Sequence, residues 1–484
     1  MIWAVLQQVG GQAVNLINFL LLAAILRPGE FGILGMAMAW LAILAAFAES
    51  GFGAAVVQRA ELEPEHLTTT FVITLAIGIL LGLLGVGLSW PAALVFRTPE
   101  LQPVMAALSL GFPIRAVSLT HAALAQRELR FRALAGRDVA SSVVGGIVSI
   151  VLALRGYGVW SLVALTLVSA AMDTVLLWRI APWRPRLGEW SLRHASELWP
   201  YSSRMLGFSL FKAAAQNADR FVIGLRLGPA EVGLYVFAWR LVVYPVSTVV
   251  GAIGQWLFSV LARAQANAVE VRRQYLYATA AVTALVTPAL VALALLAPTL
   301  VPLLGEKWRP AIVVVQVLTI VALAQAVFSP AGQVMKGLDR PGWLLAWSVG
   351  VTAFTSIGLF LGAGWGVVGA SVGFAVAHLI GIPVVLHLTR RLVTLRPADF
   401  SRYWGPSAAA SLCLGLLIWL ARRAGLATTP LGAAAALILG LGGYGLALGW
   451  LSPALVRAVR YRLRQALQGQ VRRTAAAGTA GRPG

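Results

Sequence analysis

Charged and amide side chains lie inside apolar segments of this chain, where their presence needs an explanation. The segment at 200–226 carries Lys212, Gln216, Asp219 and Arg220, which share a helical face roughly 100° wide. A charge at the centre of a membrane-spanning helix costs about 2.5–3.5 kcal/mol, so it usually faces a cavity or a partner. Lys212 has no acid one turn away on its own helix. We therefore predict that Lys212 is a ligand-binding cation.

A second polar stripe lies near the start of the chain. It consists of Gln8, Gln12, Asn15 and, at its edge, Asn18. Adding 201 to these numbers places Asn15 on Gln216 and Asn18 on Asp219, so two helices would present polar faces at matching depth. A polar stripe either lines a cavity or forms hydrogen bonds between helices. The residue types leave both interpretations open.

Further charges lie in other apolar segments. Arg115 and Arg240 are additional candidate cations, and Arg115 fits an ion pair as well as it fits a ligand contact. Glu49 and Asp173 are candidate buried acids, and together with Asp219 they are the residues that could bind a coupling ion. The small residues that follow Glu49 favour a tether between helices over a proton site.

Enzyme, cofactor and nucleic-acid functions lack support in the sequence. The chain contains no phosphate-binding loop, no nucleophile elbow and no HExxH zinc motif. One cysteine, Cys413, and five histidines provide no metal-ligand spacing, so we expect neither a metal nor a cofactor. The net charge of +21 comes from arginines between apolar runs rather than from one basic domain, which argues against nucleic acid.

These residues must be positioned by membrane-spanning helices. Of the 484 residues 59% are hydrophobic and only 11% are charged, against about 25% charged in soluble domains. A span needs about 20 apolar residues. We predict an all-α membrane protein with fourteen spans, at 2–26, 32–57, 67–95, 100–124, 133–154, 157–180, 200–226, 230–262, 273–300, 309–335, 341–363, 366–389, 403–421 and 429–451. Two short amphipathic stretches, 186–199 and 397–404, are predicted to lie in the headgroup layer.

The basic residues predict the orientation of these spans. With the N-terminus in the cytoplasm, even-numbered loops and the C-terminal tail hold 26 lysines and arginines, and odd-numbered loops hold 9. Cytoplasmic loops are enriched in these residues. We therefore predict that both termini are cytoplasmic and that the chain lies in the bacterial cytoplasmic membrane, where the basic loops meet anionic lipids.

An internal repeat predicts how the spans are grouped. The sequence PGEFG at 28–32 matches PAEVG at 229–233, and GYGV at 156–159 matches GWGV at 364–367. Pro103 similarly matches Pro310. Offsets of 201 to 208 imply a duplication of six spans. We expect an N-lobe at 1–185, a C-lobe at 186–392 preceded by an interfacial helix, two further spans at 393–452, and a basic cytoplasmic tail at 453–484.

Several of these stretches resemble one transporter family. AILRPGEFG at 24–32, QRELRFR at 126–132 and NADRFVIG at 217–224 carry the likeness, followed by LG at 227–228 and GLY at 233–235. GVWSLV at 158–163, WRP at 183–185 and LGEKWRP at 304–310 add to it. They resemble the polysaccharide transporter (Wzx-type oligosaccharide flippase) family of the multidrug/oligosaccharidyl-lipid/polysaccharide exporter superfamily. The likeness is clear over about 1–340 and loose beyond.

The resemblance implies a two-lobed transporter and a substrate. Such a protein moves undecaprenyl-diphosphate-linked oligosaccharide across the cytoplasmic membrane by alternating access, for O-antigen, exopolysaccharide or capsule synthesis. A polysaccharide polymerase and a chain-length regulator are the protein partners that it implies. The lipid diphosphate is an anion, so the resemblance also gives the cations Lys212, Arg240, Arg220 and Arg115 a role.

Alternative functions within and outside the superfamily stay open from sequence alone. A drug or cation antiporter would need acids in the cavity, whereas the first span carries amides and no acid. A lipid II flippase would share the architecture and the cationic cavity. A non-transporting scaffold of a glycan assembly complex would show the same spans.

Overall fold

The structure is a computed structural model that describes residues 2–48, 64–186, 188, 192–265 and 267–453. These residues form α-helices and short 3-10 helices, and no strand occurs among them, which confirms the predicted all-α class. The N-terminal helices are α1 (Ile2–Ile25), α2 (Pro28–Ala48), α4 (Pro64–Val95), α5 (Leu101–Ser109), α6 (Gly111–Arg127), α7 (Phe131–Leu154) and α8 (Val159–Ile180).

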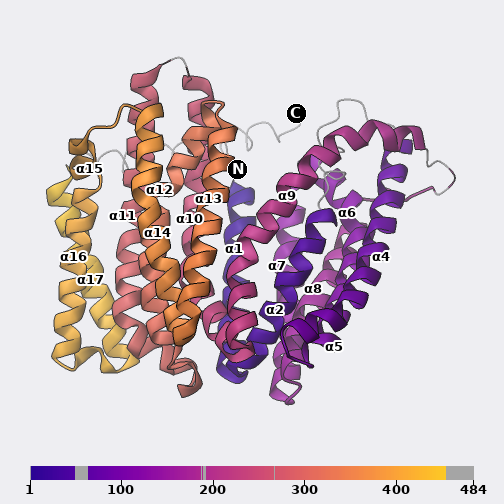
Figure 1. The fold of residues 1–484 in the computed structure, drawn as a ribbon, viewed down its shortest axis with the longest axis horizontal. Coiled ribbons are helices and arrows are strands. Elements are labelled where there is room, and N and C mark those ends of the chain that lie inside the picture. The colour runs from indigo at the N-terminus through magenta and orange to yellow at the C-terminus, as the bar shows by residue number, and fades with distance from the viewer. Residues whose placement is uncertain (1, 49–63, 187, 189–191, 266, 454–484) are drawn as a thin grey trace, which may run out of the picture. The chain divides into compact units, whose positions relative to one another are not determined.

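The remaining helices follow in the order seen in Figure 1. They are α9 (Leu192–Leu227), α10 (Pro229–Ala264), α11 (Ala268–Leu300), α12 (Ala311–Gly337), α13 (Pro341–Gly362), α14 (Gly366–Leu392), α15 (Pro397–Tyr403), α16 (Gly405–Arg423) and α17 (Pro430–Leu451). Four 3-10 segments connect them, namely η2 (Val301–Leu304), η3 (Glu306–Trp308), η4 (Ala363–Trp365) and η5 (Leu426–Thr428).

Many of these helices are long and apolar enough to cross a membrane. Eleven stretches of the described residues meet that requirement, and one of them, Gly342–Leu392, contains both α13 and α14. The apolar part of α1 within the same residues, Gly10–Ile25, is shorter. Helix α9 is long enough but not apolar enough, because charged residues such as Lys212, Asp219 and Arg220 interrupt its apolar sequence. The chain is therefore a multi-pass membrane protein, as its composition predicts.

The predicted span at 100–124 is divided into two helices, α5 and α6, which meet at Leu110. Pro113 explains the break. It has no N–H to donate to the carbonyl of Ser109, and its ring would clash with that carbonyl in a continuous helix. The Leu110 amide instead bonds the Ala107 carbonyl at 3.1 Å, which tightens the end of α5.

The chain divides into two compact units. The first unit contains Met1–Leu241, Val301–Val317 and Ser348–His378, and the second contains Val242–Leu300, Leu318–Trp347 and Leu379–Gly484. The N-lobe and C-lobe were defined by the sequence repeat, whereas these two units are defined by compactness. The division into lobes therefore stays a prediction. The predicted basic tail lies almost wholly outside the described residues. The first interfacial helix was expected at 186–199. Residues 192–199 of that stretch are instead the first residues of α9.

Side chains from η3 fasten the end of α1 within the first unit. Lys307 Nζ donates to the Ala24 carbonyl at 2.8 Å, and Trp308 Nε1 donates to the Ala23 carbonyl at 2.7 Å. The last four carbonyls of a helix lack partners within the helix, so these contacts cap α1. Trp308 is fully buried and stacks on Phe237 of α10, with ring centroids 4.1 Å apart. A segment from the middle of the chain thereby helps to position α1.

In the second unit, α11 packs against α16 and α17. Three side chains hydrogen-bond to main-chain carbonyls across these contacts. Arg422 donates to Leu295 at 2.7 Å, Thr299 to Ala427 at 2.8 Å and Tyr444 to Ala284 at 2.7 Å. A polar side chain buried among apolar helices needs such a partner. The last two spans are thus fastened to α11.

Candidate functional site

A cavity of about 780 Å³ lies within the first unit, and six helices contribute to its lining. Its residues are Gly11, Gln12 and Asn15 of α1, Leu34 and Met38 of α2, Arg115 of α6, Asp138, Ser141 and Ser142 of α7, Leu165, Thr166, Ser169 and Asp173 of α8, and Arg240 of α10. The volume falls in the range of about 300–1,000 Å³ that is usual for ligand sites. The lining is mostly polar or charged, although the surrounding helices are apolar.

Two arginines from distant parts of the sequence meet in this lining. The side chain of Arg115 is exposed and lines the cavity. The guanidinium of Arg240 lies 4.7 Å from the centre of the Phe19 ring, a distance at which a cation is attracted to an aromatic face. Both cations were predicted from sequence, and the fold brings them into one cavity.

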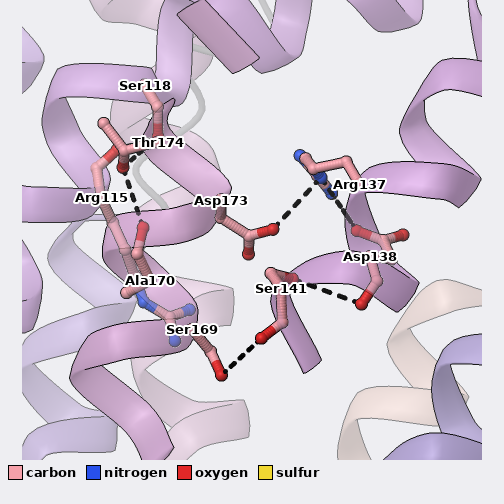
Figure 2. A network of polar contacts seen from close by, with 9 residues as sticks. All are labelled: Arg115, Ser118, Arg137, Asp138, Ser141, Ser169, Ala170, Asp173 and Thr174. Atoms are coloured by element: carbon pink, nitrogen blue, oxygen red, sulfur yellow. Dashed lines mark hydrogen bonds and ion pairs between the residues drawn. The ribbon is translucent and has the colours of Figure 1, made fainter. Parts of the chain in front are cut away.

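Acids on α7 and α8 share a third arginine beside the cavity (Figure 2). Arg137 Nε lies 3.0 Å from Asp138 Oδ1 and 3.4 Å from Asp173 Oδ1. Asp173 was predicted from sequence as a buried acid, and its side chain is 37% exposed. Arg115 is near enough to Asp173 for the two charges to interact. Arg137 therefore balances the two acids of the lining, and Arg115 adds positive charge beside them.

The polar residues of α1 have two different roles, both of which the sequence left open. Some line the cavity, and one forms a hydrogen bond to a neighbouring helix. Gln12 and Asn15 line the cavity. Asn18 is buried instead, and its amide donates to the Ser142 carbonyl of α7 at 2.8 Å. Gly146 of α7 permits that approach, because a Cβ atom there would collide with the Asn18 amide. Gln8 lies in the part of α1 whose side chains the structure does not describe.

The polar residues of α9 do not line this cavity. Lys212 and Gln216 have exposed side chains. Asp219 is buried, and its Oδ1 accepts the amide of Arg220 at 2.8 Å. The Arg220 guanidinium donates to Asn217 Oδ1, also at 2.8 Å. The structure therefore separates these residues from Arg115 and Arg240, and their functional role stays a prediction. Glu49 lies outside the described residues.

Five polar lining residues were not predicted from the sequence: Asp138, Ser141, Ser142, Thr166 and Ser169. Their spacing is a helical one, since steps of three or four residues place them on one face of α7 and one face of α8. Thr166, Ser169 and Asp173 form such a stripe on α8. Looking for small hydroxyl residues at this spacing, and not only for charges, would have found them.

No group of three or more histidine, cysteine or acidic side chains converges within the described residues in a way that could hold a metal ion. The chemistry available in the cavity is therefore that of two guanidinium groups, two carboxylates, amides and hydroxyls. Guanidinium groups bind phosphate-like anions, and the other groups form hydrogen bonds with polar ligands. The arrangement is suited to binding a polar, anionic ligand between helices.

Comparisons with known proteins agree with this architecture. The sequence model of a family described as "Polysaccharide biosynthesis protein" matches residues 21–313. The chain is 27% identical over 351 residues to the succinoglycan biosynthesis transport protein ExoT of Rhizobium meliloti (strain 1021), covering 72% of this chain and 70% of the relative. It is 26% identical over 387 residues to the lipopolysaccharide biosynthesis protein WzxC of Escherichia coli (strain K12), covering 78% and 77%.

A solved structure has a similar fold. The lipid II flippase MurJ in an inward closed conformation superposes with a TM-score of 0.76, covering 94% of this chain and 100% of that one. The two sequences are only 11% identical, so this likeness shows the fold and not the substrate. It supports the predicted all-α fold built from many membrane-spanning helices.

Proposed function

This chain belongs to the polysaccharide biosynthesis protein family, and on that premise we propose that it carries an undecaprenyl-diphosphate-linked oligosaccharide across the bacterial cytoplasmic membrane. The family membership makes it a membrane transporter of polysaccharide biosynthesis. Of the two relatives, one is named as a transport protein of succinoglycan biosynthesis and the other as a lipopolysaccharide biosynthesis protein. The proposed cargo is accordingly a lipid-linked building block of such a polysaccharide.

The observation that carries this proposal is the pair of arginines in the cavity. Arg115 and Arg240 lie on α6 and α10 and line the same space. A lipid diphosphate must leave the headgroup layer to cross the membrane, and it loses water contacts when it does so. Guanidinium groups replace those contacts with charge-assisted hydrogen bonds to phosphate oxygens. In the proposal, these two arginines hold the diphosphate while the cavity alternates between the two membrane faces.

Other parts of the proposal rest on sequence. Lys212 and Arg220 are proposed to contact the diphosphate at another stage of the cycle, because they lie on α9 and outside the described cavity. Asp173, Asp219 and Glu49 are the proposed positions for a coupling ion. The distribution of basic loops supports cytoplasmic termini. A polysaccharide polymerase and a chain-length regulator are the proposed partners, since they would use the translocated cargo.

A translocation experiment tests the role of the arginines. Arg115→Ala, Arg240→Ala and the double variant are introduced into the full chain, and polysaccharide production and membrane abundance are measured in cells that lack the native transporter. We expect the double variant to be inserted at normal abundance and to produce no polysaccharide. Arg115→Lys should keep part of the activity, because it retains the charge and loses the bidentate geometry.

Arg226→Ala is the matched control. Arg226 of α9 also lies over an aromatic ring, with its guanidinium 3.9 Å from the centre of Phe360, but it is not part of the cavity lining. Its removal should leave transport unchanged. Polysaccharide production at the wild-type level by the Arg115→Ala, Arg240→Ala double variant would refute the proposed site.

A further inference from the structure

Four buried aromatic rings pack together next to the cavity of the first unit. We call them the aromatic plug: Phe19 of α1, Phe31 of α2, Phe237 of α10 and Trp308 of η3, each at most 3% exposed. The Phe19 ring contacts those of Phe31 and Phe237, with centroids 5.5 Å and 5.8 Å away. The Trp308 ring contacts the same two, at 5.5 Å and 4.1 Å. Such pairs add to the stabilisation that burial gives, so the plug holds these four elements together.

The plug lies one helical turn beyond the cavity lining in each of three helices. The pairs of lining residue and plug residue are Asn15 with Phe19 in α1, Leu34 with Phe31 in α2, and Arg240 with Phe237 in α10. Residues three or four apart are neighbours on one face of a helix. The step leads toward the end of α1 and toward the starts of α2 and α10. The plug therefore separates the cavity from that end of the helices, which is the outer end in the predicted orientation.

Phe19 belongs to the plug and also holds a residue of the cavity lining. Its ring centre lies 4.7 Å from the guanidinium of Arg240. The attraction between a cation and an aromatic face needs none of the N–H groups that bond phosphate oxygens. Phe19 can therefore fix the position of Arg240 without competing with an anion in the cavity. The ring joins the plug to the proposed diphosphate site.

We infer that Phe19 is a positioning residue, which gives Arg240 its full affinity for the diphosphate only while the aromatic plug is closed. The inference rests on the proposed function, since it concerns the same arginine. Release at the outer face requires the plug to open, and opening moves Phe19 of α1 away from Arg240 of α10. Arg240 then loses the ring that holds it, so the diphosphate is bound more weakly at the stage at which it must leave. The coupling is reciprocal, because a bound diphosphate favours the closed plug by the same factor.

Binding of a synthetic polyprenyl diphosphate that carries no sugar tests the role of Phe19 in the purified full chain. Phe19→Leu keeps an apolar side chain and removes the aromatic face. We expect it to weaken binding about three- to tenfold, as loss of a cation–aromatic contact would give. In an Arg240→Ala chain the same substitution should cause no further weakening, because the cation that the ring positions is absent. Such a cycle isolates the interaction between the two side chains.

Phe96→Leu is the matched control. Phe96 is 4% exposed, and its ring lies 5.8 Å from that of Phe221 at an angle of 33°. Phe19 is 2% exposed and pairs with Phe237 at the same distance and at 35°. Phe96→Leu thus removes a comparable buried ring that is not part of the plug. It should leave the affinity for the diphosphate unchanged.

A disulfide between α2 and α10 tests the dependence on the closed plug. A Cβ atom on Gly35 would lie 3.0 Å from Cγ2 of Val236, which brings cysteines at these positions within reach of each other. The variant is Gly35→Cys with Val236→Cys in a Cys413→Ala background. We expect the oxidised chain to bind the diphosphate at least as tightly as the reduced chain and to transport no cargo. Reduction should restore transport.

The outcomes separate this inference from the proposed function. Unchanged binding by Phe19→Leu, or equal weakening in the presence and absence of Arg240, would overturn the positioning role. Weaker binding by the oxidised chain would overturn the dependence on a closed plug, and transport by that chain would show that the plug need not open. If Arg115→Ala, Arg240→Ala bound the diphosphate as tightly as the wild type, the proposed function itself would fail.

Discussion

The carbonyl oxygen of Pro229 occupies the position that a Cβ atom on Gly32 would need. The contact is reciprocal, because a Cβ atom on Gly233 would collide with the carbonyl of Pro28. These four residues are related by the repeat offset of 201. The first turns of α2 and α10 therefore cross at a distance that only glycine permits, and each repeat supplies one glycine and one carbonyl. This reciprocity agrees with the duplication inferred from sequence.

We predict that Gly32→Ala strongly destabilises the protein. The atom it would meet belongs to the main chain, which cannot rotate away as a flexible side chain can. Overpacking of this kind costs about 3 kcal/mol or more. Thermal unfolding in detergent and the yield of monodisperse protein would measure the loss. Gly29→Ala is the control, because no atom lies within 4 Å of its added Cβ. Equal stability of the two variants would contradict the predicted collision.

A second prediction concerns pH and the ion pair between α11 and α15. Arg272 donates to Asp399 Oδ1 at 2.6 Å, and the Arg396 amide donates to Asp399 Oδ2 at 2.7 Å. Burial alone would raise the pKa of Asp399, but these hydrogen bonds outweigh it and lower the pKa below the usual value. The stabilisation is therefore complete above the unfolded-state pKa of about 3.9 and is lost as the pH falls through the folded-state pKa.

Asp399→Asn should accordingly lower stability by about 1–2 kcal/mol at neutral pH, as loss of a partly exposed charged hydrogen bond does. The difference from the wild type should begin to shrink below about pH 4, where the unfolded chain binds the proton, and should be lost once the pH falls through the lower pKa of the folded carboxylate. Unfolding temperatures over a series of pH values provide the measurement. Glu306→Gln is the control, since its pair with Arg309 is about 70% exposed on both sides and should contribute little. A difference that is independent of pH would count against the ionic explanation.

A third prediction separates Lys212 from Arg220 on α9. Lys212 has an exposed side chain, so Lys212→Ala should reduce transport without lowering membrane abundance, and Lys212→Arg should retain part of the activity. Arg220 also bonds the buried Asn217, so Arg220→Ala should lower abundance in addition to removing its proposed contact with the diphosphate. Quantitative blotting beside polysaccharide production gives both values. Full transport by Lys212→Ala would exclude Lys212 from substrate binding.

A fourth prediction concerns the membrane orientation. In a Cys413→Ala background, a cysteine at Arg132 should be protected from an impermeant thiol reagent in intact cells, because the loop before α7 is predicted to be cytoplasmic. A cysteine at Gly364, in η4, should be labelled. Arg132 lies in the first turn of α7, and Gly364 lies in η4 between α13 and α14. The opposite labelling pattern would reverse the predicted orientation.

The sequence alone determined the class of protein and indicated the repeat, whereas the fourteen predicted spans stay a prediction beside the eleven stretches found among the described residues. These properties follow from local hydrophobicity and from short matching motifs, so they need no knowledge of which helices meet. The break between α5 and α6 could not have been predicted from Pro113 alone, because α4, α10, α11, α12 and α14 each contain a proline and stay continuous. Arg115, Arg240 and Asp173 were identified because charges cost free energy in any apolar segment.

Only the tertiary structure decided which polar residues share a cavity. Asn15 and Asn18 are one turn apart and chemically identical, yet Asn15 lines the cavity and Asn18 bonds α7. Their roles depend on where Gly146 lets α7 approach α1, and spacing within α1 cannot reveal that approach. Lys212 was the stronger candidate from sequence because no acid lies one turn away on its own helix, but it is not among the residues that line the cavity of Arg115 and Arg240. Helix rotation is set by packing against neighbouring helices, which is a long-range property of the fold.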